Sequence, residues 1–113
     1  MTNQLDNYFS ALADPTRRAV VERLTQGPAA VSALHHGHDM ALPTFLRHLK
    51  VLEDSGLVTS TKKGRVRTVH IEAAPLRILD NWLARHRDMW EARLDRLSRL
   101  AEAMEERDAD DPI

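Results

Sequence analysis

The spacing of hydrophobic positions changes in the middle of the chain, from a helical repeat to the pattern of β-strands. Residues 42–55 predict a helix, because a proline stands in the first turn and apolar residues then recur at intervals of three and four. Gly56 marks the expected end of this helix. Residues 57–71 hold two runs rich in β-branched residues around Gly64, which predicts a β-hairpin.

Shorter helices are expected before this segment, and one long helix after it. Residues 5–12 predict the first helix, Asp14 and Pro15 suit the N-cap and first position of the second, and residues 29–36 predict the third. From Pro75 onward, apolar residues recur at spacings of three, four and seven. They are Leu76, Leu79, Leu83, Trp90, Leu94, Leu97, Ala101 and Met104.

The expected fold is mainly α with a small β-hairpin. A helix that buries one face and is followed by a basic hairpin is the arrangement of a winged helix-turn-helix. We expect residues 1–104 to form this single domain, because 113 residues suffice for one modest core. Residues 105–113 are polar and acidic and are expected to be a disordered tail.

Composition excludes several classes of chemistry. The chain has no cysteine, so disulfides, thiolate metal ligands and cysteine nucleophiles are ruled out. No apolar run reaches membrane-spanning length and no secretion signal opens the chain, so a cytoplasmic location is expected. There is no glycine-rich phosphate loop or nucleophile elbow, so we do not expect an enzyme, and no cofactor is expected.

Charge is distributed unevenly along the chain. The net charge is −1, which alone would argue against a nucleic-acid partner. Residues 42–71, however, carry six cations against two acids, a local charge of +4, whereas residues 105–113 carry five acids against one arginine. Charges farther apart than about 8–10 Å are largely screened, so duplex DNA would respond to the local basic segment.

The exposed face of the helix over residues 42–55 and the following hairpin supply the candidate DNA contacts. Arg47 can form two parallel hydrogen bonds with guanine, Thr44 can bond a base edge or a phosphate, and Lys50 suits a phosphate. The candidate set is Pro43, Thr44, Arg47, His48, Lys50, Lys62, Lys63, Arg65 and Arg67. The alternative interpretations are a solvated helix face and a charged edge that prevents strand aggregation.

These residues resemble a known family. Residues 11–18, ALADPTRR, are similar to the opening signature of ArsR-type bacterial transcriptional regulators. Residues 42–53 and the following Gly56-Leu57-Val58 are similar to their recognition helix, and Trp82-Leu83 with Trp90-Glu91 resembles the last helix of the metal-independent branch. The resemblance covers about residues 5–104 and implies a homodimeric winged-helix repressor that binds an inverted repeat in a promoter.

Two positions depart from the family pattern. Many members have serine at the position of Ala41, where it caps the recognition helix, and serine at the position of Leu46. Leucine cannot hydrogen-bond a base, but it can pack on a thymine methyl group or enter the core. Sequence preference is therefore expected to differ from that of the serine-bearing relatives.

The long last helix predicts a dimer. A domain this small cannot bury the whole apolar edge internally, and a twofold dimer would place two recognition helices roughly 34 Å apart, one turn of DNA. The competing interpretation places both tryptophans in the core of one chain. The expected dimer residues are Tyr8, Phe9, Leu79, Trp82, Leu83, Trp90, Leu94 and Leu97. An apolar pocket near Trp82, Trp90 and Tyr8 is the place expected for an unknown small-molecule inducer.

A histidine cluster leaves a second function open. His35, His36 and His38, with Asp39, are candidates for a zinc or nickel site. The more ordinary interpretation is a polar turn between two helices. The alternatives to a simple DNA-binding repressor are thus a metal-responsive regulator and a winged-helix module that binds a protein partner.

Overall fold

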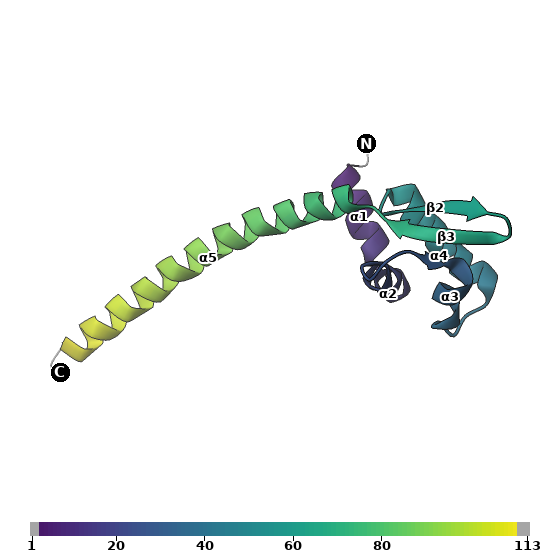
Figure 1. The fold of residues 1–113 in the computed structure, drawn as a ribbon. Coiled ribbons are helices and arrows are strands. Elements are labelled where there is room, and N and C mark those ends of the chain that lie inside the picture. Colours follow the sequence, from purple (N-terminus) through teal and green to yellow (C-terminus); the bar gives the residue numbers. More distant parts are fainter. Residues whose placement is uncertain (1–2, 111–113) are drawn as a thin grey trace. The chain divides into compact units, whose positions relative to one another are not determined.

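Helices and one small sheet make up the fold (Figure 1). The computed structural model describes residues 3–110, which fall into two compact units, one ending at Leu79 and one beginning at Asp80. In chain order the elements are α1 Gln4–Leu12, α2 Pro15–Leu24, β1 Ala29–Ala30, α3 Val31–His36, α4 Leu42–Ser55, β2 Val58–Lys63, β3 Val66–Ile71 and α5 Ala73–Asp110. The predicted order of four helices, a hairpin and a long helix is confirmed.

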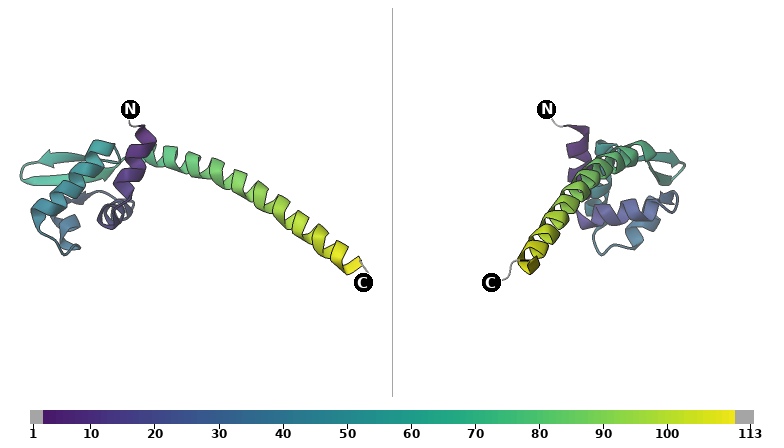
Figure 2. Two further views of the ribbon diagram at one scale, coloured as in Figure 1. Left: turned by 180° about the vertical axis from the view of Figure 1, so that it is seen from behind. Right: turned by 90° about the vertical axis from the view of Figure 1, so that its left-hand side faces the viewer.

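The sheet has one strand more than the predicted hairpin. Its order is β1-β3-β2, with antiparallel pairing throughout, and Ala29 lies opposite Val69. This corrects the prediction of a helix over residues 29–36: the backbone of Ala29 and Ala30 pairs with β3, so α3 begins only at Val31. Figure 2 shows the hairpin turn at the end of the sheet away from α1.

Two glycines with positive φ allow the end of α4 and the turn of the hairpin. Gly56 has φ 90° and follows the last residue of α4, and the Leu57 N–H donates to the Leu52 carbonyl at 3.2 Å, as in a Schellman motif. Lys63 lies opposite Val66, so the hairpin loop has two residues, of which Gly64 has φ 63°. Glycine at the first loop position matches a type II′ hairpin, which suits the twist of the strands.

The core of the first unit is centred on one face of α4. Phe45, Leu49, Leu52 and Leu57 are completely buried, and buried residues from α1, α2, α3 and β3 pack with them in the same core. The helical spacing of Leu42 relative to Phe45 and Leu49 predicts that it also faces the core, but Leu42 is 45% exposed, so this prediction is wrong. It stands in the first turn of α4, before the helix reaches the core.

The long helix α5 begins slightly earlier and ends later than the sequence predicts. It starts at Ala73, which leaves Pro75 in the first turn, where proline is tolerated. Residues 105–110 are helical rather than disordered, since glutamate, arginine and alanine favour a helix. Residues 111–113 of the predicted tail lie outside the described residues. Within residues 3–110, no helix combines the length and hydropathy needed to cross a bilayer.

The start of α2 is fixed by a side-chain cap. Asp14 is the N-cap residue, and its Oδ2 accepts a hydrogen bond of 3.1 Å from the backbone N–H of Arg17. This hydrogen bond is the main reason that the pKa of Asp14 lies below its ordinary value, and the nearby charges of His48 and Arg17 lower it further. Partial burial acts in the opposite direction.

We expect Asp14→Ala to lower the free energy of unfolding by about 0.5–2 kcal/mol near neutral pH, the usual effect of losing such a cap. Asp14→Asn, the matched control, keeps an accepting oxygen and should retain most of the stability. Because the native pKa is depressed, the carboxylate stabilises the fold above its unfolded pKa, and this contribution is lost as pH falls through the native pKa. Urea unfolding followed by circular dichroism should show the Asp14→Ala difference shrinking with acid; a constant difference would contradict this.

Candidate DNA-binding surface

The N-terminal half of α4 has an exposed polar face opposite the core. Pro43, Thr44 and Arg47 are all exposed on this face. The Arg47 guanidinium has no hydrogen-bond or ion-pair partner anywhere in residues 3–110. All of its donors are therefore available to a ligand, and their planar fork matches O6 and N7 of guanine.

Lys50 lies farther along α4 and has a partner on the same helix. Its Nζ is 3.4 Å from Oδ2 of Asp54, and both side chains are mostly exposed. Exposed ion pairs of this spacing contribute only a few tenths of a kcal/mol. Lys50 can therefore exchange Asp54 for a phosphate at little cost.

The hairpin carries three cations that are free to meet a ligand. Lys62, Lys63 and Arg65 are exposed, and none of them has a hydrogen-bond or ion-pair partner among the described residues. Arg65 stands in the two-residue loop beside Gly64. This end of the hairpin is a concentrated positive charge of the kind that contacts phosphates or a minor groove.

Arg67 differs from the other cations of the hairpin. Its Nη2 donates to Oε1 of Glu53 on α4, and its Nε donates to Oγ of Ser60 on β2 at 2.9 Å. The side chain is only partly exposed. Its guanidinium therefore connects the hairpin to α4, and its predicted contact with DNA stays a prediction.

A groove runs between the hairpin and the helices. It has a volume of about 610 Å³, and α3, α4 and both hairpin strands contribute to its walls. The walls combine cations and hydroxyls with apolar side chains, and none of the acidic residues within residues 3–110 lines the groove. The lining residues are Ala30, Val31, Ser32, Leu46, Ser60, Lys62, Arg65, Val66 and Arg67.

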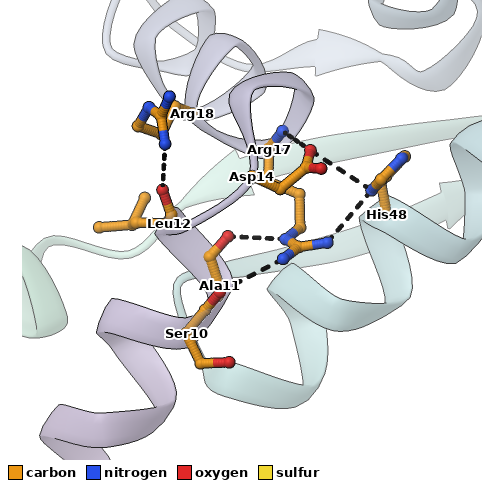
Figure 3. Close-up of polar contacts among 7 residues, drawn as sticks. All are labelled: Ser10, Ala11, Leu12, Asp14, Arg17, Arg18 and His48. Carbon is orange, nitrogen blue, oxygen red and sulfur yellow. Dashed lines mark hydrogen bonds and ion pairs between the residues drawn. The ribbon is translucent and has the colours of Figure 1, made fainter.

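Arg17 joins three helices at the other side of α4 (Figure 3). Its Nε donates to the Ala11 carbonyl at 2.7 Å and its Nη2 to the Ser10 carbonyl at 3.2 Å, so it satisfies carbonyls at the end of α1. Its Nη1 lies 3.2 Å from Nδ1 of His48 on α4. Asp14 Oδ2 is 3.6 Å from the same ring nitrogen.

These contacts define the role of His48, which was predicted to contact DNA. Because arginine can only donate, Nδ1 can accept this hydrogen bond only when the ring is neutral and its proton is on Nε2; when the ring is protonated, Nδ1 faces the Asp14 carboxylate instead. In Figure 3 the second ring nitrogen points away from both Arg17 and Asp14. A contact of Nε2 with DNA stays a prediction, and only this nitrogen is available to make it.

Sequence reasoning did not identify Arg17 as part of the site. It lies 31 residues from His48, and no helical or strand spacing connects the two positions. The sequence signals for Arg17 are its place in the ALADPTRR segment and its position three residues after the Asp14 N-cap, which keeps it near the end of α1. Arg18 occupies a similar place and donates to the Leu12 carbonyl at 2.9 Å (Figure 3).

The predicted dimer residues separate into buried and exposed groups. Tyr8 and Leu79 are buried in the core of the first unit, so we leave them out of the proposed dimer surface. Phe9 is 39% exposed, and Trp82 is partly exposed and stacks on His86 with ring centroids 4.0 Å apart. More than half of the surface of each remaining side chain is exposed; these are Leu83, Trp90, Leu94 and Leu97.

The three clustered histidines do not converge on one point. His35 Nε2 lies 2.7 Å from the Met40 carbonyl, and the rings of His35 and His38 both pack 5.3 Å from the ring of Phe45. Within residues 3–110, no group of three or more His, Cys, Asp or Glu side chains is placed to hold a metal ion. The alternative of a metal site at His35, His36 and His38 therefore lacks geometric support.

Several known proteins are similar to this chain in sequence and in fold. A family described as a helix-turn-helix domain matches residues 12–61. The HTH-type transcriptional regulator Rv2034 of Mycobacterium tuberculosis is 40% identical over 74 residues, which cover 66% of this chain and 69% of that protein. An ArsR family transcriptional regulator of known crystal structure has 53% sequence identity to this chain and a TM-score of 0.74. The match covers 79% of this chain and 98% of that chain.

A further solved structure is described as a homodimer. It is the solution structure of the homodimeric winged helix-turn-helix DNA-binding domain of Mb0332 from Mycobacterium bovis, a possible ArsR-family regulator. It is 28% identical with a TM-score of 0.62, and the match covers 74% of this chain and 81% of that one. Together with the fold, these similarities confirm the resemblance seen in residues 11–18 and in α4. The chain belongs to the ArsR family of helix-turn-helix transcriptional regulators.

Proposed function

We propose that this regulator is a homodimeric repressor that recognises an inverted-repeat site in promoter DNA. The observation that carries the proposal is Arg47 on the exposed face of α4, next to a hairpin with the cations Lys62, Lys63 and Arg65, none of which has a partner in the part of the chain that the structure describes. The contact of Arg67 with Glu53 connects the hairpin to α4, which supports a single surface that combines the proposed base and phosphate contacts. Thr44 and Lys50 add donors on the same side of the helix.

The apolar stripe of α5 supports the homodimer. Leu83, Trp90 and Leu97 recur at intervals of seven, so they lie along one side of the helix, and all three are more than half exposed. Exposed apolar side chains that recur along one side of a helix are unfavourable in water and indicate an interface. Arg93 lies 5.9 Å from the centre of the Trp90 ring and covers part of one ring face. The homodimeric relative from Mycobacterium bovis adds support for the same assembly.

A twofold dimer explains why an inverted repeat is the proposed site. Two identical recognition helices related by a twofold axis meet two identical half-sites, whose centres lie roughly 34 Å apart on one face of the duplex. Repression follows when such a dimer occupies DNA that the polymerase needs. The repressor role is also what the resemblance to the family implies.

We expect Arg47→Ala to weaken binding to the selected operator by about 1–3 kcal/mol, roughly five- to 150-fold in Kd, because one bidentate base contact is lost. Binding to random duplex should change little, since phosphate contacts remain. Fluorescence anisotropy at two salt concentrations measures both. Arg23→Ala, which removes an exposed cation from α2, is the matched control and should bind like the wild type.

Equal losses on operator and random DNA would show that Arg47 does not contact a base. No complex of the wild-type protein with any duplex, at any salt concentration, would remove the DNA-binding proposal altogether. The chain would then be better explained as a module that binds a protein partner.

We expect Leu97→Glu to convert the dimer to monomers, because it places a charge in the middle of the apolar stripe. Ala92→Glu is the control: it introduces the same side chain on the other side of α5 and should leave the dimer intact. Sedimentation equilibrium measures the assembly state. If both variants assemble like the wild type, the stripe is not the dimer interface.

A further inference from the structure

Leu46 is an exposed apolar side chain in the half of α4 that carries Arg47. Its side chain is 37% exposed, which rules out the alternative that it enters the core. Leu42, one helical turn earlier on the same flank, is 45% exposed. Two leucines thus face outward beside Arg47, although the core-facing leucines of the same helix, Leu49 and Leu52, are completely buried.

The surroundings of Leu46 are cationic. Together with Val31 and Val66 it provides an apolar wall of the groove between the hairpin and the helices, which Lys62 and Arg65 also line. The cations attract a polyanion, but their charged groups offer no apolar surface on which the exposed part of Leu46 could pack. An apolar side chain in such a place contributes to binding only if the ligand brings an apolar group to it.

Duplex DNA offers one such group in its major groove. Each base pair presents hydrogen-bond donors and acceptors there, and the C5-methyl group of thymine is the apolar exception. We infer that Leu46 packs against the C5-methyl group of a thymine and thereby selects thymine at one position of each half-site. The inference rests on the proposed DNA-binding function and adds a specificity contact next to that of Arg47.

Replacing thymine with deoxyuridine tests this contact, because the exchange removes the methyl group and leaves base pairing unchanged. The site is first selected from a random duplex library with the wild-type protein. Each thymine of the selected site is then replaced singly by deoxyuridine, and Kd is measured. We expect one position in each half-site to lose about fourfold in affinity, the effect of one buried methyl group, with no change elsewhere.

Variants of α4 assign the effect to a side chain. In Leu46→Ala the sensitive position should bind thymine and deoxyuridine equally, whereas Leu46→Met should keep the preference because its side chain is still apolar and long. Val51→Ala is the matched control, since it truncates another exposed apolar residue of α4, and it should keep the preference. Leu46→Ser replaces the alanine variant in the comparison if that variant does not fold.

The outcomes separate this inference from the proposed function. Binding to a selected site with no deoxyuridine-sensitive thymine overturns the inference and leaves the DNA-binding function standing. The same conclusion follows if the sensitive position keeps its preference in Leu46→Ala, or in Leu46→Ser where the alanine variant does not fold. A wild-type protein that selects no DNA from the library overturns both.

Discussion

The whole recognition surface depends on the burial of one face of α4. Phe45, Leu49 and Leu52 have no exposed surface, and truncating any of them would cost about 2–5 kcal/mol. The helix cannot turn about its axis without exposing these side chains. Thr44 and Arg47, on the opposite face, are therefore held outward by packing that they take no part in.

Two arginines hold the flanks of the same helix. On one side Arg17 joins the end of α1 to His48, and on the other Arg67 joins the hairpin to Glu53. Both are cations near a surface proposed for DNA, yet several of their N–H donors are already engaged within the chain. Loss of DNA binding after substitution of either arginine would therefore not demonstrate a phosphate contact, because the position of α4 would change as well.

Local sequence signals predicted the elements that depend on local structure. The cap at Asp14-Pro15, the end of α4 at Gly56 and the hairpin around Gly64 are all present, since each depends on backbone conformations that these residue types favour. The strand Ala29–Ala30 was missed because its pairing partner, β3, is distant in the sequence. Propensity alone cannot identify such a partner.

In the candidate site, too, some features follow from local sequence and others depend on residues that are distant in the sequence. The exposure of Arg47 and Lys50 follows from the helical period, so the sequence sufficed to place them. The partners of His48 and Arg67 come from other elements, and only the folded chain brings them within hydrogen-bond distance. The burial of Tyr8 and Leu79 likewise depends on how helices pack, which an apolar spacing does not specify.

The two-residue loop of the hairpin has a thermodynamic consequence for association. Gly64 and Arg65 leave almost no backbone length to rearrange, and the contact of Arg67 with Glu53 restrains the strand that follows. A ligand that meets this hairpin orders the side chains of Lys62, Lys63 and Arg65 but not their backbone. Ordering the backbone costs about 1–2 kcal/mol per residue. The hairpin loses this conformational entropy when the chain folds, whereas a flexible basic arm would lose it on binding DNA.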